Sequence, residues 1–402
     1  MHDLFTKIRL YSRLRKQRGA ALMVMLVILV LGATAILVSS LSSIGLRIER
    51  DKITADALAQ AKDALIGRGI VDISSPGSLP CPDTNDDGSA ESTVGQPNGN
   101  CPSYIGRLPW KTLGLPDLRD GSGEPLWYAL SPNFRDYVTL NPINSNSKGT
   151  LLVYHADGLS LQTETGYNAV AVIFSPGSAL ASQTRNTATD QNSAANYLDI
   201  ANSRNNASAS GPFIAGTKSE TFNDQLLFIT TKNLMPLVEQ RVAGEVKLAL
   251  ANYYTVNGYY PWADSVAQYT DYDSNAGLNR GWLPNSAATS GSYPTPNWTV
   301  GSPPQWFFDN EWYKLIYYSV SKNYTRNPSI CSTCIDSTLL VDGVSGGRAL
   351  FFMPGTPIGT LIRSPTTLSD YLEDSQNYDD ANDLYVTPTS QAGDRDRIYR
   401  LP

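Results

Sequence analysis

The chain has 402 residues, a formal net charge of −6, 17% charged residues and 41% hydrophobic residues. This length is enough for two domains. The mildly acidic charge, with no basic cluster in the bulk of the chain, argues against nucleic acid as a partner. The composition includes 22 Tyr, 31 Gly and 25 Pro, which favours short strands and turns over a helical bundle.

The first predicted element is an apolar helix near the N-terminus. No charged side chain occurs between Gly19 and Leu46, and a helix of roughly 28 residues rises about 42 Å, more than the ~30 Å hydrocarbon core of a bilayer. This length predicts a transmembrane helix over residues 20–46. Basic residues precede it against the single acid Asp3, which predicts a cytoplasmic N-terminus and an exported bulk; they are Lys7, Arg9, Arg13, Arg15, Lys16 and Arg18.

The small residues in this region lie before the apolar run, as Arg18-Gly19-Ala20. A secretory signal has a shorter apolar core and a small-residue cleavage site after it. The arrangement resembles the class III signal of type IV pilins and type II secretion pseudopilins. The resemblance implies that prepilin peptidase removes residues 1–19 by cutting after Gly19, so that Ala20 becomes the N-terminus. An uncleaved membrane anchor is the alternative.

One residue departs from the pattern of the major subunits in that family. They carry a glutamate at the fifth mature position, where this chain has Val24. The chain therefore resembles minor pilins and tip-type pseudopilins. The resemblance implies a structural subunit, anchored in the inner membrane and assembled into or at the tip of a type IV pilus or type II secretion pseudopilus. Its partners would be the inner membrane, prepilin peptidase and other pilin or pseudopilin subunits, and its bulk would be periplasmic or, after assembly, at the cell surface.

Two apolar stripes with helical spacing follow. The first extends the N-terminal helix until Gly67 and Gly69 end it, and its members are Ile44, Ile48, Ala55, Leu58, Ala61 and Leu65. The second begins near Pro236, ends at Gly258, and contains Val238, Val242, Val246, Leu250 and Tyr253.

The segments after each stripe match one another in the same order. The paired segments are 77–83 with 258–264, 106–110 with 280–284, 124–134 with 311–324, 149–155 with 337–343, 169–177 with 348–355, 195–200 with 369–374, and 222–230 with 394–402. Ordered self-similarity of this kind is typical of a repeat. We therefore expect an α+β fold in which the long transmembrane helix continues into a pilin-like head of two tandem units, residues 47–231 and 232–402.

Each unit is predicted to pack a helix across an antiparallel sheet and to have its own core. In the first unit Leu58 and Leu65 are expected to face strands at residues 150–156 and 168–177.

All four cysteines lie on the side predicted to be exported, where disulfides persist. Proximity along the chain favours Cys81–Cys101 and Cys331–Cys334, although four cysteines allow three connectivities. The close spacing of Cys331 and Cys334 also suits a metal ligand pair, but no second close pair exists to complete a zinc site.

Three acidic loops are candidates for calcium binding. In the first, Asp83, Asn85, Asp87, Gly88 and Glu91 reproduce the opening of a calcium loop, although Val94 stands where the bidentate acid belongs. The second has Asp271, Asp273 and Asn275, and the third has Glu373, Asp374, Asp379, Asp380 and Asp383. The resemblance to pseudopilins favours the third loop, because that family often holds calcium in its C-terminal sheet. Solvated turns without metal are the alternative for each loop.

No catalytic residue is predicted. The only histidines are His2 and His155, and no nucleophile motif or phosphate-binding glycine loop occurs. The chain is therefore expected not to be an enzyme. The rival to a filament subunit is an adhesin-like surface or periplasmic binding protein that uses a pilin-type anchor only for export.

Overall fold

The computed structural model describes residues 17–136, 142–267, 277–284, 298, 302–331, 334, 339–345, 347–379, 383–388 and 395–402, without the side chains of residues 17–22 and 32–44. The chain forms two compact units, Met1–Ala55 and Asp56–Pro402. The second is called the main unit below. Its first half is residues 56–230 and its second half is residues 231–402.

The α-helices are α1 (Gln17–Val71), α2 (Ala188–Gln191), α3 (Thr231–Asn257), α4 (Gln305–Asp309) and α5 (Ser375–Tyr378). The strands of the first half are β1 (Ile105–Arg107), β2 (Trp127–Leu130), β3 (Val153–Tyr154), β4 (Ala169–Ser175), β5 (Ile200–Ala201), β6 (Arg204–Asn205), β7 (Phe213–Ile214) and β8 (Gln225–Thr230). Those of the second half are β9 (Arg280–Trp282), β10 (Tyr317–Val320), β11 (Leu340–Val341), β12 (Val344–Ser345), β13 (Ala349–Met353), β14 (Leu384–Tyr385) and β15 (Arg397–Leu401).

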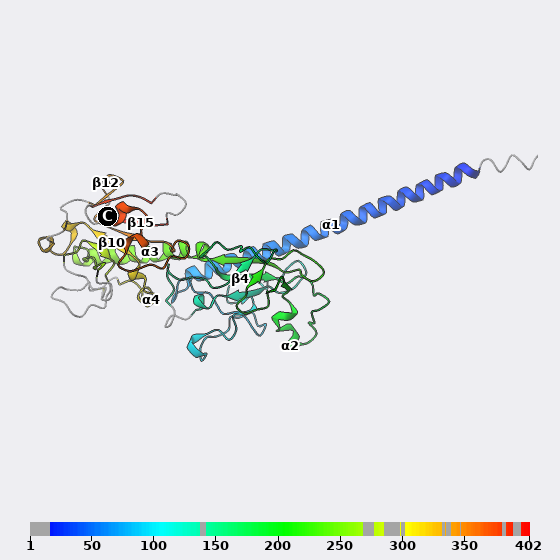
Figure 1. Cartoon of the computed structure of the whole chain (residues 1–402), viewed down its shortest axis with the longest axis horizontal. Coiled ribbons are helices and arrows are strands. Elements are labelled where there is room, and N and C mark those ends of the chain that lie inside the picture. The colour runs from blue at the N-terminus through cyan, green and yellow to red at the C-terminus, as the bar shows by residue number, and fades with distance from the viewer. Residues whose placement is uncertain are drawn as a thin grey trace, which may run out of the picture. The chain divides into compact units, whose positions relative to one another are not determined.

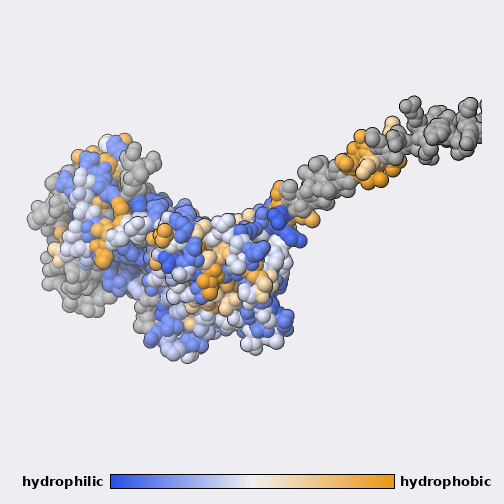
Figure 2. Space-filling model, turned by 45° about the vertical axis from the view of Figure 1, so that its right-hand side comes forward, coloured by the Kyte–Doolittle hydropathy of each residue, from blue (hydrophilic) through white to orange (hydrophobic). Residues whose placement is uncertain are grey.

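The described part of α1 does not include a membrane-spanning segment. The described apolar side chains at residues 23–31 are exposed on α1 and form an orange band in Figure 2. Yet across the described parts of the chain no helix is long and apolar enough to cross a membrane. The predictions of a transmembrane helix over residues 20–46 and of single-pass anchoring in the inner membrane are therefore wrong.

The boundaries of the two long helices also differ from expectation. α1 continues through Gly67 and Gly69 to Val71, because a helix tolerates isolated glycines, and close packing favours glycine at position 69. A Cβ on Gly69 would lie 3.3 Å from both Leu234 Cδ1 and Leu79 Cδ2. α3 begins five residues before Pro236, since Thr230 and Asn233 form a capping box at its start.

The main unit contains two four-stranded antiparallel sheets, one in each half. Their strand orders are β1-β2-β4-β8 and β9-β10-β13-β15. Each half also has a small parallel pair outside its main sheet, β3 with β7 and β11 with β14. The two sheets therefore share one strand order. Figure 1 shows β4 of the first sheet, β10 and β15 of the second, and α3, which contacts both β8 and β15.

The chain enters the two sheets in the same way. Asp83 forms an antiparallel bridge with Arg107 of β1, and Asp264 forms one with Trp282 of β9. At both bridges a glycine of the strand lies against the aspartate carbonyl. A Cβ on Gly106 would come within 2.4 Å of the Asp83 oxygen, and one on Gly281 within 1.8 Å of the Asp264 oxygen. Only glycine fits at these two positions without moving the backbone.

Replacing Gly106 or Gly281 by alanine is expected to lower the free energy of unfolding by about 1–3 kcal/mol, because the methyl group displaces a backbone carbonyl. Gly244→Ala in α3 is the matched control. No atom lies within 4 Å of its added Cβ, so it is expected to stabilise the helix by about 1 kcal/mol. Urea unfolding of the three variants measures the difference. A Gly106→Ala variant as stable as the control would contradict this packing.

The two halves of the main unit share a hydrophobic core. One cluster of buried residues combines both halves: it includes Leu58 and Leu65 of α1, Ile173 of β4, Val246 of α3 and Phe352 of β13. The expectation that each half has its own core is therefore wrong. The physical reason is that the apolar stripe of α3 contacts the first half near its N-terminal end and the second half beyond it.

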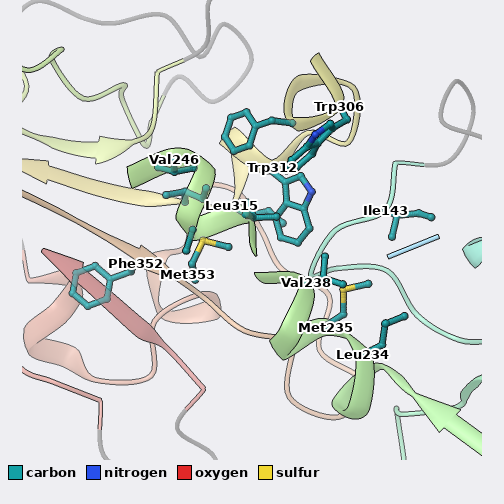
Figure 3. Packing of buried hydrophobic residues seen from close by; sticks show 14 of the residues in the cluster. Ile143, Leu234, Met235, Val238, Val246, Trp306, Trp312, Leu315, Phe352 and Met353 are labelled. Atoms are coloured by element: carbon teal, nitrogen blue, oxygen red, sulfur yellow. The ribbon is translucent and has the colours of Figure 1, made fainter. Parts of the chain in front are cut away.

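Figure 3 shows this junction, where Ile143 of the first half lies near Met235 and Val238 of α3. Distances from Gly77 also place Ile143 close to Met235, since a Cβ on Gly77 would lie 2.8 Å from Ile143 Cγ2 and 3.4 Å from Met235 Cε.

The first sheet buries its two faces in different clusters. Tyr128 and Ile173 face the shared core with Leu58 and Leu65. Trp127 and Phe174 point to a smaller cluster that contains Leu151, Val153, Tyr197 and Phe213. Leu58 and Leu65 therefore share a cluster with β4, as predicted for residues 168–177. The prediction that they also face residues 150–156 is wrong, because Leu151 and Val153 lie in the smaller cluster.

Arg241 of α3 ties the end of α1 to the second half. Its guanidinium donates to the carbonyls of Ile70 and, at 2.6 Å, Asp72. It also lies 5.2 Å from the ring centroid of Trp306. A cation at the C-terminal end of a helix satisfies carbonyls that have no partner within the helix and opposes the negative end of its dipole.

Candidate functional site

The first candidate calcium loop is folded around the buried side chain of Asp83. Its Oδ1 accepts hydrogen bonds from the N–H groups of Asn85 at 3.0 Å and Asp86 at 2.8 Å. Its Oδ2 accepts one from the N–H of Gly88 at 2.7 Å. The carboxylate thus receives the backbone donors of the turn, which is the usual role of an aspartate that begins a tight turn.

The other oxygen-bearing side chains of this loop also bond within it. Asn85 Oδ1 accepts from the N–H of Asp87 at 3.0 Å, and Glu91 Oε1 accepts from Thr84 Oγ1 at 2.5 Å. Asp87 Oδ1 accepts from the N–H of Ser89 at 2.7 Å, and this hydrogen bond lowers the pKa of Asp87. The alternation of oxygens that indicated calcium therefore also produces a turn of local hydrogen bonds.

The candidate residues of the second loop lie outside the described residues, and the third loop is described only in part. Asp271, Asp273, Asn275 and Asp380 lie outside the described residues. Asp383 is buried, and its Oδ1 lies 2.6 Å from Arg280 Nη2 of β9. Arg280 also donates to the backbone carbonyl of Asp379 at 3.3 Å, so an arginine lies where the third loop was expected to hold a cation.

Within the described residues, no group of three or more His, Cys, Asp or Glu side chains is arranged to hold a metal ion. Calcium binding stays a prediction for these loops.

Each half has a pair of acidic side chains that hydrogen-bond to one another's backbone. Asp199, Asp224 and Asp396 are buried, and Glu373, a residue of the third candidate loop, is half-buried. In the first half Asp199 Oδ2 accepts from the N–H of Asn223 at 2.7 Å, and Asp224 Oδ2 accepts from the N–H of Asp199 at 2.8 Å. In the second half Glu373 and Asp396 exchange the same kind of contact, with Asp396 Oδ2 accepting from the N–H of Glu373 at 3.0 Å and Glu373 Oε2 from the N–H of Asp396 at 3.3 Å. Each pair fastens a loop to the strand that closes the main sheet.

Burial raises the pKa of Asp199, and burial together with the neighbouring charge of Asp199 raises the pKa of Asp224. Two carboxyl groups with raised pKa values can carry out acid–base catalysis when a substrate reaches them. Here both side chains are at most 5% exposed and receive backbone N–H groups. The hydrogen bonds of Asp199 and Asp224 therefore hold the loop at Asp199 to the segment that leads into β8. The paired segments 195–200 and 369–374 contained this signal, since each carries one acid of its pair.

A cavity of about 610 Å³ lies where the two halves of the main unit meet. Residues 142–148 form one wall and residues 357–363 form another. Its charged side chains are engaged: Lys148 Nζ donates to the Leu361 carbonyl at 3.0 Å, and Glu311 Oε1 lies 2.7 Å from Lys314 Nζ. The buried Arg363 donates to the Pro354 carbonyl at 2.7 Å. This lining offers a binding surface of amides, hydroxyls and aliphatic groups, without histidine or cysteine.

The remaining predicted residues lie as follows. Gly19 and Ala20 are in the first turns of α1, and cleavage between them stays a prediction. The structure joins Cys81 to Cys101 and Cys331 to Cys334 by disulfide bonds. His155 is exposed, and its ring Nδ1 lies 3.4 Å from Gln162 Nε2.

No protein-family model, curated protein or solved structure matches the chain. A functional assignment therefore rests on the residues and their arrangement.

Proposed function

We propose that the chain is a structural subunit without enzymatic activity, of the minor pilin or pseudopilin kind, that assembles into or at the tip of a type IV pilus or type II secretion pseudopilus. The observation that carries the proposal is α1, a continuous helix of 55 residues. Its residues within the main unit bury Ala57, Leu58, Ala61 and Leu65 in one cluster with strands of an antiparallel sheet. A long helix whose last turns pack on such a sheet is the arrangement that the resemblance to pilins implies.

Two further features support this proposal. Disulfide-bonded cysteines suit an exported protein, since thiols stay reduced in the cytosol. The buried carboxyl groups and the charged residues of the cavity bond to the protein itself, which suits a structural role. The proposed partners are prepilin peptidase and other pilin or pseudopilin subunits.

The mature chain is expected to begin at Ala20. Intact-protein mass spectrometry of the chain from cells with and without prepilin peptidase measures this, and only cells with the enzyme should lose residues 1–19. Gly19→Val should block the cut, whereas Gly45→Val is the control that should leave it unchanged. Met1 retained in both strains, or a start beyond Ser40, would contradict the assignment.

A binding function is the second candidate, and the cavity between residues 142–148 and 357–363 favours it. In that case the chain would be an exported, adhesin-like protein. A strain that lacks the chain separates the two candidates. Loss of filaments supports the subunit, whereas loss of attachment with filaments intact supports the binding protein.

A further inference from the structure

Residues 142–147, called the latch loop, reach from the first half of the main unit onto the second. The N–H of Ile143 donates to Asn310 Oδ1 at 2.7 Å, and Asn144 Nδ2 donates to the Asn310 carbonyl at 2.8 Å. Asn310 is fully buried and so receives the loop through both its side chain and its backbone. Arg363 Nη1 adds a contact to Asn146 Oδ1 at 3.1 Å. The loop is thus attached to the second half by three hydrogen bonds, at Ile143, Asn144 and Asn146.

The latch loop covers an ionisable group. Glu239 of α3 is 1% exposed, and its Oε1 accepts a hydrogen bond from Ser145 Oγ, which is also buried. The neighbouring helical residue Val238 lies near Ile143 in Figure 3. Because glutamate is almost never fully buried unless it is paired, this position on an apolar helix face requires an explanation.

The groups around Glu239 have opposing effects. Arg397 and Tyr399 of β15 lie on one side, and Arg363 and Glu373 belong to the segment between β13 and β15. On α3 itself, Arg241 donates to the end of α1. Burial raises the pKa of Glu239 to about 7, although the Ser145 hydrogen bond and the two arginines lower it. The loss of hydration therefore dominates at this site.

The latch loop is thin and has open space on its outer side. Pro142 and Asn146 are exposed, whereas Ser145 between them is buried. The cavity of about 610 Å³ is lined by Pro142, Asn144, Asn146 and Ser147. Moving the loop outward would therefore bring water to Glu239 while the strands of both sheets keep their pairing.

We propose that the latch loop is a pH-sensitive latch between the two halves, closed over Glu239 in mildly acidic solution and opening more often as the pH rises to neutral. The sign follows from linkage. A carboxyl group whose pKa is higher in the closed state than in the hydrated state favours closure below its ordinary pKa of 4.5. This advantage is lost as the pH rises through the window from 4.5 to about 7. Above that window Glu239 is ionised in both states, and the opening equilibrium becomes constant.

Hydrogen exchange of the full chain, followed by mass spectrometry of peptides that cover residues 142–148, tests the proposal. After correction for intrinsic exchange rates, protection of these amides is expected to fall about tenfold per pH unit between pH 5 and 7 and to level off above pH 7. Glu239→Gln should remove this slope. Glu245→Gln, which removes a half-exposed carboxylate of the same helix, should keep it.

The unmodified chain decides the proposal even where a variant folds poorly. Constant protection of residues 142–148 from pH 5 to 8 would overturn it, as would a Glu239→Gln variant with the slope of the unmodified chain. Ser145→Ala keeps the carboxyl group and removes its hydroxyl donor, so its protection should be lower at every pH with the slope retained. Unchanged protection in Ser145→Ala would show that this contact does not fasten the loop.

Discussion

Replacing Trp312 by alanine is expected to lower the free energy of unfolding by about 3–5 kcal/mol. Trp312 is fully buried in the cluster that contains residues of both halves, and Figure 3 shows it near Leu315. Removing the indole leaves a cavity that the sheet and α3 can fill only in part, so the transfer free energy and the packing contacts are both lost. Urea unfolding followed by circular dichroism measures the change.

Because the core is shared, the same substitution is expected to destabilise both halves together. Hydrogen exchange of peptides over β4 in the first half and β13 in the second half should report one cooperative transition. Val344→Ala is the control, since Val344 is 64% exposed and surface substitutions change stability by about 0.5 kcal/mol or less. If β13 loses protection in Trp312→Ala while β4 keeps it, the two halves unfold separately and the shared core does not couple them.

Replacing Cys81 and Cys101 by serine is expected to cost about 3 kcal/mol, and replacing Cys331 and Cys334 about half as much. The first disulfide closes a loop with a sequence separation of 20 and the second one of 3. A cross-link stabilises a protein chiefly by restricting the unfolded chain, and the restriction increases with loop length.

The comparison is matched, since all four sulfur atoms belong to buried residues and each double variant introduces two serines. Thermal unfolding of the two variants under identical conditions gives the two losses. Equal losses, or a larger loss for the Cys331–Cys334 pair, would show that local packing and not chain entropy sets the contribution of these bonds.

Much of the local structure can be predicted from the sequence alone. The apolar runs at residues 169–177 and 348–355 lie on β4 and β13, and those at 222–230 and 394–402 lie on β8 and β15. A run of β-branched and aromatic residues followed by Pro-Gly predicts a strand and its end from that segment alone. Four of the ordered matches fall on strands at corresponding positions of two sheets with one strand order, namely β1 with β9, β2 with β10, β4 with β13 and β8 with β15.

Local pattern failed where the outcome depended on what packs against a segment. The uncharged run from Gly19 to Leu46 predicted a membrane span, which the described helices do not support. Glu239 follows Val238 in the apolar stripe of α3, yet nothing in its own neighbourhood indicates that it is buried. For the acidic loop at residues 83–91 calcium stays a prediction, and the structure adds that its oxygens receive hydrogen bonds from nearby donors.

The sequence by itself therefore determined the main helices and strands, their order along the chain and the pairing of cysteines that lie close in sequence. These features depend on neighbouring stretches of the chain. Only the tertiary structure decided that the two halves share one core and that Ser145 meets Glu239, 94 positions away. Contacts at such separation are selected by the burial of apolar surface across the whole unit, and that burial also fixes which charged groups lose water and change their pKa.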